Sequence, residues 1–333
     1  MIRLARRSMT SIEDARAALQ TAIQLEFGTL PPYLYSLYTI RPGTNAAATE
    51  RIKSVVMQEM VHFCLDCNIL NAIGGTPRFV ESVPVYPGPL PGDLGGLTIH
   101  LLPFSEAAMQ QGMAIETPVD GPIEYPTLEA VDEQWQTIGE FYADLQTCLE
   151  GLPAKAWHAD RHQITDAQFL VSELFPVGGL EDAKRAIHVI VSEGEGSSVS
   201  PLDLDGDLAH FYRFKEIADD TLLTRTPEPP GYAWMGSLGV DFDAAFPAIA
   251  DPSQHDFSDD PAAAAAQQAC NLAFSVMLDE LELAVSGKPR HLGNAVRAMF
   301  DLRMAAITAL TTPLKGTSDV AGPAFIYVPR SER

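Results

Sequence analysis

Acidic and imidazole side chains lie on helix faces that the surrounding pattern marks as buried, and this constrains the fold more than any other feature. Glu59 and His62 are three residues apart, so they project from one side of an α-helix. That side is otherwise apolar and carries Ile52, Val55, Val56, Ile69 and Leu70. Glu26 lies on a similar apolar stripe earlier in the chain. Because a lone buried carboxylate is costly, the pattern predicts a buried cation between two helices.

Length and charge limit the classes of protein to which the chain can belong. Its 333 residues are enough for one large domain with a substantial core. The formal net charge of −22 argues against nucleic-acid and anionic-membrane partners. Residues 1–7 are basic, but no long apolar segment follows them. We therefore expect a cytoplasmic protein that binds neither nucleic acid nor membrane.

Apolar periodicity and helix-capping signals predict a mainly α chain, folded as a single domain over residues 1–333. Four core helices are expected at about 11–40, 45–73, 127–150 and 180–219, the last with a Gly- and Asp-rich interruption before a piece at 207–219. Two C-terminal helices are expected within 261–311, at about 261–286 and 289–311. Gly28 and the pair Pro31-Pro32 predict a kink or break just after Glu26.

Two long connections separate these helices. Residues 75–126 alternate Pro and Gly at first, then predict a short strand at 97–101 and a brief helix near 105–113. A connection of this length is expected to be structured or functional. Residues 222–260 are rich in Pro, Asp and Gly and predict an extended surface linker.

The donor types indicate which metal would suit the buried acids. A mixed set of carboxylates and imidazole favours iron or manganese over calcium or a structural zinc. Bundles that hold two such ions take a Glu from each of two helices and a Glu-x-x-His pair from each of the other two. The first half of the chain supplies one half-set, namely Glu26, Glu59 and His62.

The second half-set is ambiguous from the residues alone. The third helix offers Glu133, Glu140 and Asp144. The fourth offers Glu193 and Glu195 without a histidine three residues later, and His210 is the nearest downstream candidate.

Several stretches resemble one known family. They are residues 24–34, 59–63 and 71–77, followed by shorter matches at 138–142, 194–196, 210–214 and 322–325. Together they resemble the ferritin-like iminophenyl-pyruvate dimer synthase family, whose domain also occurs within a violacein-pathway protein. The resemblance implies a ferritin-like four-helix bundle with a long structured crossover and additional C-terminal helices. It implies six metal ligands, Glu26, Glu59, His62, Glu140, Glu195 and His210, with Glu193 as the substitute for Glu195.

The resemblance also implies a function. It predicts a dinuclear oxidase or oxygenase, with two Fe ions or in their place Mn, that uses dioxygen. Its substrate would be a small amino-acid-derived amine or imine, and a homo-oligomer is compatible with this role. Two other hypotheses stay open: a metal-binding or iron-handling protein without organic substrate, and a degenerate scaffold for partner binding.

Overall fold

The computed structural model describes residues 2–118, 135–165, 173–194, 200–203, 205–227 and 231–333. Their helices are α1 (Ile12–Thr39), α2 (Ala46–Ala72), α3 (Glu106–Ile115), α4 (Ile138–Glu150), α6 (Leu180–Gly194), α7 (His210–Ala218), α8 (Pro261–Val285) and α9 (Leu292–Leu310). The described residues also contain two small antiparallel pairs, β1 (Leu4–Ala5) with β2 (Trp135–Gln136) and β3 (Leu222–Arg225) with β4 (Tyr232–Met235). The mainly α prediction is confirmed.

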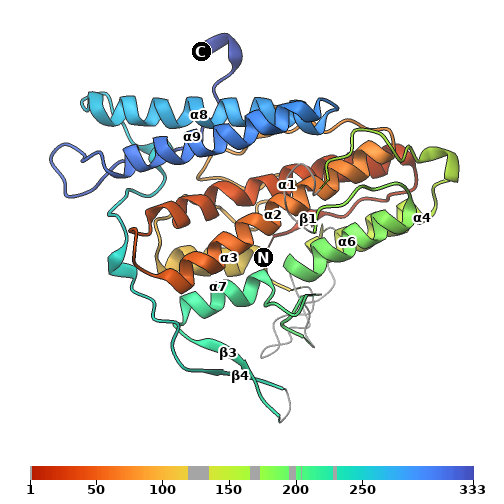
Figure 1. The fold of residues 1–333 in the computed structure, drawn as a ribbon, viewed down its shortest axis with the longest axis horizontal. Coiled ribbons are helices and arrows are strands. Elements are labelled where there is room, and N and C mark those ends of the chain that lie inside the picture. Colours follow the sequence, from red (N-terminus) through yellow and green to blue (C-terminus); the bar gives the residue numbers. More distant parts are fainter. Residues whose placement is uncertain (1, 119–134, 166–172, 195–199, 204, 228–230) are drawn as a thin grey trace.

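Helices α1 and α2 form the middle layer of the molecule (Figure 1). They pack against each other along their length, and α8 and α9 cover one side of the pair. Helices α4, α6 and α7 cover the other side, with α3 packed against α7. The α1–α2 pair therefore has two buried sides, and this explains why apolar residues surround most of its circumference.

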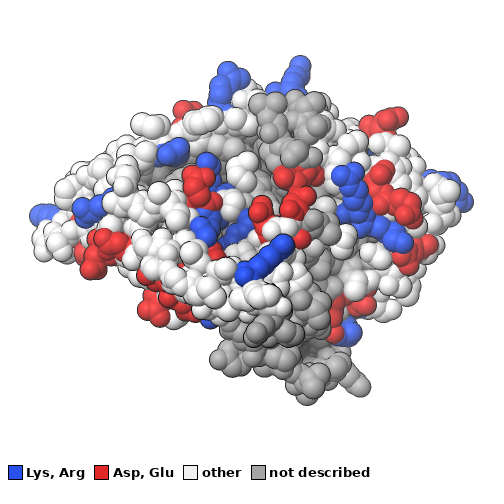
Figure 2. All heavy atoms as spheres, turned by 60° about the horizontal axis from the view of Figure 1, so that its bottom comes forward, with Lys and Arg blue, Asp and Glu red and all other residues white. Residues whose placement is uncertain are grey.

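The chain has a net negative charge, but on the surface its acidic and basic side chains are not separated into distinct regions (Figure 2). On the face shown in Figure 2, acidic and basic side chains are interspersed, with no large basic patch. None of the helices in the described ranges combines the length and the apolar character that a membrane span needs.

Of the predicted kink or break after Glu26, the break is wrong, because α1 runs unbroken through Pro31 and Pro32. A proline inside a helix leaves a backbone carbonyl one turn earlier without its usual donor. The Tyr86 hydroxyl, from the crossover, donates to the carbonyl of Gly28 at 2.5 Å. Gly28 also lets the crossover approach closely, since an added Cβ would lie 3.1 Å from Leu90. A tertiary contact thus replaces the helical hydrogen bond that Pro32 cannot donate.

Other predicted boundaries hold to different degrees. The ends of α1, α2, α8 and α9 match the predicted ranges within three residues. The third core helix begins at Ile138 rather than 127, because Trp135–Gln136 pairs with the N-terminal strand; residues 127–134 lie outside the described part. The predicted strand at 97–101 is reduced to a single bridge between Ile99 and Gly88, and the linker 222–260 contains the β3–β4 hairpin.

The C-terminal segment is held by a row of polar side chains on α8. Gln267, Asn271 and Ser275 are spaced four apart and accept backbone N–H groups from residues 324, 326 and 328. Asp279 extends this row by one more turn and accepts hydrogen bonds from Tyr327 and Arg333. Residues 322–328 therefore lie along α8 as an extended tail, without joining a sheet.

Candidate metal centre

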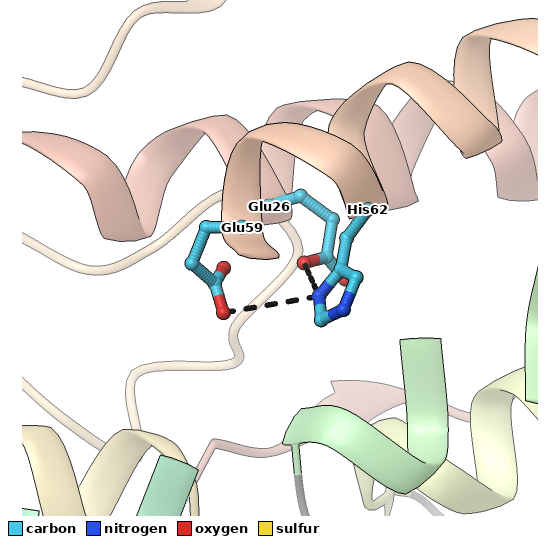
Figure 3. A group of neighbouring side chains, drawn as sticks. All are labelled: Glu26, Glu59 and His62. Atoms are coloured by element: carbon cyan, nitrogen blue, oxygen red, sulfur yellow. Dashed lines mark ion pairs between the residues drawn. The ribbon is translucent and has the colours of Figure 1, made fainter. Parts of the chain in front are cut away.

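The two helices of the middle layer carry residues that face each of the two layers packed against them. Successive residues of an α-helix differ by about 100° around its axis. Glu26 and Thr29 of α1, with Glu59 and His62 of α2, therefore face α4 and α6, where they line a small cavity. Figure 3 shows Glu26, Glu59 and His62 converging from the two helices.

The first group of donors is the predicted half-set. Glu26, Glu59 and His62 are buried and offer donor atoms within 4.8 Å of one another. The Nδ1 atom of His62 lies 3.6 Å from Glu26 Oε2 and 3.9 Å from Glu59 Oε1. These separations leave a position between three donors, as a bound cation requires.

A second group lies beside the first and shares Glu59. It consists of Glu59, Glu116 and His210, again all buried and within 4.8 Å of one another. The Nδ1 atom of His210 lies 2.9 Å from Glu59 Oε1 and 3.7 Å from Glu116 Oε2. The two imidazole rings stack with their centroids 5.6 Å apart. Two adjacent groups with one common carboxylate have the arrangement of a dinuclear centre.

Neighbouring groups turn the Nδ1 atom of His210 toward the centre. Its Nε2 lies 3.2 Å from Gln58 Oε1, which also accepts a hydrogen bond from Arg213 at 2.6 Å. Because that oxygen can only accept, the Nε2 of His210 is the protonated nitrogen. Within the described residues Nδ1 makes no hydrogen bond of good geometry, although it is buried. A lone pair left without a donor suits a metal ion.

His62 is oriented in the same way. Its Nε2 lies 2.9 Å from Glu193 Oε2 on α6, so this carboxylate accepts the Nε2 proton. The opposite nitrogen, Nδ1, then faces Glu26 and Glu59. In this geometry Glu193 positions an imidazole and is outside both donor groups.

The carboxylates are held by hydroxyl groups. The Thr29 hydroxyl donates to Glu59 Oε2 at 2.7 Å. The Tyr142 hydroxyl lies 2.8 Å from both Glu26 Oε1 and Asp66 Oδ2. The hydroxyl is placed to donate to either carboxyl group, so it links Glu26 to Asp66. Burial and the charge of Glu26 raise the pKa of Asp66 well above its ordinary value.

Without a cation, the centre retains protons. Burial and the carboxylates of Glu116 and Glu26 raise the pKa of Glu59 to about 7. Burial opposes the charged form of both imidazoles, but the adjacent carboxylates outweigh it and raise the pKa of His62 and of His210. In the metal-free protein, protons are therefore favoured on the same donor atoms that would bind a metal ion.

Metal binding is consequently expected to release protons, because imidazole and carboxylate ligands bind in their deprotonated forms. The raised pKa values of His62 and His210 stabilise the metal-free fold below about pH 6.5, and this contribution is lost as the pH rises. Glu59 also stabilises the metal-free fold while it is protonated, and this contribution is lost as the pH rises from the ordinary pKa of a glutamate to about 7. The metal-dependent rise in melting temperature should therefore grow from about pH 5 to about pH 8. Calorimetric titration in buffers of different ionisation enthalpy measures the protons, and a buffer-independent heat would contradict the expectation.

Of the two remaining predicted ligands, Glu140 lies outside both groups. Glu140 is the third residue of α4, where its carboxylate accepts the Thr137 N–H at 3.0 Å and pairs with Arg6 at 3.1 Å. It forms a capping box, for which Thr137-x-x-Glu140 is the sequence signature, and its side chain is about one-third exposed. The structure therefore does not bring Glu140 to either donor group. Glu195 lies outside the described residues.

Sequence reasoning missed Glu116, which lies at the C-terminal end of α3 in the crossover. Its carboxylate joins the second group and accepts a hydrogen bond from the Tyr33 hydroxyl. A signal was present, since Met109, Gly112 and Glu116 follow a helical stripe whose other members are buried. The short helix lies within a long connection, outside the predicted core helices, and its acid is absent from the predicted ligands.

The cavity at the centre is small. Its volume is about 30 Å³, and its apolar wall includes Leu25, Ile115, Ile138 and Ile190. This space suits ions and a water molecule but is too small for an aromatic ring.

Comparison with known proteins agrees with this architecture. The ferritin-like family model matches residues 19–219. A curated relative, the dichlorochromopyrrolate synthase of Lentzea aerocolonigenes, is 22% identical over 390 aligned residues, covering 96% of this chain but only 37% of that protein. The crystal structure of a ferritin-like protein from Caulobacter vibrioides superposes with a TM-score of 0.62 at 22% identity, covering 90% of this chain and 98% of that chain. The chain belongs to the ferritin-like family.

Proposed function

We propose that this protein is a dinuclear metal oxidase or oxygenase that acts on a small amino-acid-derived amine or imine. The observation that carries the proposal is the pair of buried donor groups that share Glu59. Mixed carboxylate and imidazole donors favour iron, with manganese as the alternative. The resemblance to iminophenyl-pyruvate dimer synthases supports the substrate class, and the name of the Lentzea relative refers to the synthesis of a small molecule.

The bound metal would supply the redox chemistry, since two ferrous ions can deliver two electrons to dioxygen. Glu26, Glu59 and His62 would hold one ion, and Glu59, Glu116 and His210 the other. Glu193 and Gln58 would keep the Nδ1 atoms of the two imidazoles deprotonated, by accepting the Nε2 protons. The apolar wall of the cavity would exclude bulk water from the reacting groups.

The proposal is tested by metal content and by turnover together. Protein loaded anaerobically with ferrous iron is exposed to air with an aromatic imino acid, generated in place by an amino-acid oxidase and catalase. Mass spectrometry should detect an oxidised or coupled product that is absent without the protein and absent without iron. Loaded protein that yields no such product from any aromatic imino acid would refute the oxidase proposal.

One observation favours a second candidate function, the handling of iron without an organic substrate. The cavity bounded by the described residues holds ions and water but not an aromatic molecule. An iron-handling protein would oxidise ferrous iron and consume dioxygen without an added imine. An oxygen electrode separates the two functions: consumption that is unchanged by the imine favours iron handling.

A further inference from the structure

We propose that the protein has a second binding site, on the opposite side of α1 and α2 from the metal centre, for a small amphipathic anion. The ligand class is an apolar chain or ring system that carries one carboxylate or similar anionic group. The site is a cavity of about 660 Å³ between the α1–α2 pair and the α8–α9 pair. Known ligand pockets have volumes of roughly 300–1,000 Å³, whereas voids of this size are rare in close-packed interiors.

The residues that form the cavity alternate with those of the metal centre. Phe27 and Leu30 of α1, with Met60 and Phe63 of α2, line this cavity. Each directly follows a residue that lines the cavity of the metal centre. The helix pair therefore separates the two sites, so the second site is not an extension of the first.

The wall of the cavity is apolar and adaptable. Besides aromatic and aliphatic side chains it contains four of the ten methionines, Met57, Met60, Met277 and Met299. Methionine side chains are flexible and adjust to apolar ligands of different shape. At the edge, Met57, Phe300 and Ile307 are 39%, 64% and 42% exposed, so apolar surface extends from the cavity to solvent.

The charges on the lining argue for an anion. Three of its four charged residues are basic, Arg41, Lys53 and Arg303, in a chain with twice as many acids as bases. Lys53 pairs with the fourth, Glu50, at 3.6 Å. Within the described residues the exposed guanidinium of Arg303 has no hydrogen-bond or ion-pair partner. Arg303 is therefore the residue best placed to meet an anionic group.

Paired fluorescent probes test both parts of the proposal on the full chain. Anilinonaphthalenesulfonate is apolar and anionic, and phenylnaphthylamine is a similar uncharged molecule. We expect the anionic probe to bind at one site per chain, more tightly than the neutral one, including in protein stripped of metal by a chelator. Octanoate, decanoate and dodecanoate should displace it with affinities that rise about fourfold per methylene group.

Two variants and a matched control locate the site. Met299→Trp fills the cavity from α9 and should weaken both probes about tenfold or more. Arg303 is exposed, so the substitution Arg303→Glu leaves the core intact. It should weaken binding of the anionic probe about fivefold and leave binding of the neutral probe unchanged. Arg297→Glu is the control, since Arg297 lies exposed on the same helix but does not line the cavity. Metal content should be unaffected in all three.

Three results would overturn the proposal. The first is equal affinity for the charged and neutral probes, and the second is unchanged binding in both Met299→Trp and Arg303→Glu. The third concerns a second copy of the chain as the occupant. If light scattering shows a dimer that Phe300→Glu dissociates, and the probes bind only the dissociated form, the cavity is a subunit interface rather than a ligand site.

Discussion

Replacing Glu59 with glutamine is expected to remove essentially all bound metal, reducing the content from about two ions per chain to nearly none. Glu59 belongs to both donor groups, so its loss removes a charged ligand from both ions. Glutamine keeps the size of the side chain and still accepts the hydrogen bond from Thr29. Metal analysis after anaerobic loading and desalting measures the effect, and circular dichroism should stay essentially unchanged.

Two further variants, Glu116→Gln and Glu140→Gln, test which carboxylates bind the metal. Glu116 belongs to the second group alone, so Glu116→Gln should lose about one ion and keep the first. Glu140 lies in the capping box of α4, so Glu140→Gln should keep full metal content and lose only about 0.5–1 kcal/mol of stability. Full metal content in Glu59→Gln, or its loss in Glu140→Gln, would show that the donor groups are assigned wrongly.

Removing the metal is expected to lower the melting temperature by roughly 10 °C. Four buried carboxyl groups, those of Glu26, Glu59, Glu116 and Glu193, lie against two histidines, and Tyr142 links a fifth, that of Asp66, to Glu26. Without cations their mutual repulsion is reduced only by retained protons. Two ions, each at about 100 times its dissociation constant, would together contribute about 5 kcal/mol, and each kcal/mol shifts the melting temperature of a chain this large by roughly 2 °C.

Scanning calorimetry with and without a chelator measures this difference. Ferrous or manganous ions should restore the higher melting temperature, whereas calcium should not, because it prefers an all-oxygen site with more ligands. In Glu59→Gln the metal-free protein should be at least as stable as the metal-free parent, since a buried acid with a raised pKa has been neutralised. A melting temperature that does not respond to iron, manganese or the chelator would contradict a metal-filled centre.

Long periodic helices were the part of the fold that could be predicted reliably. The helices α1, α2, α8 and α9 have clear capping and breaking signals, such as the Ser11–Asp14 capping box and the glycine pair after α2. The continuous path of α1 through Pro31 and Pro32 was not predictable, because the compensating donor is Tyr86. That residue is distant in the chain, and no local pattern connects it with α1.

The same limit applies to the candidate centre. Glu26, Glu59 and His62 could be grouped from sequence because each lies on an apolar stripe of a long helix. Glu116 and His210 come from short helices next to irregular segments, and their shared group forms only where α7 packs against α2 and α3 packs against α7. Glu140, which the family resemblance implies as a ligand, has a local role in this structure, since its carboxylate completes the capping box of α4.

By itself the sequence determined the helical class, the long helices and the first group of buried donors, because these depend on periodicity within one segment. Only the tertiary structure decided which acid completes the second group, which nitrogen of each histidine faces the centre, and where a large apolar cavity remains. These features depend on distances between residues far apart in the chain. Packing of whole helices fixes such distances, and no local pattern of residues encodes them.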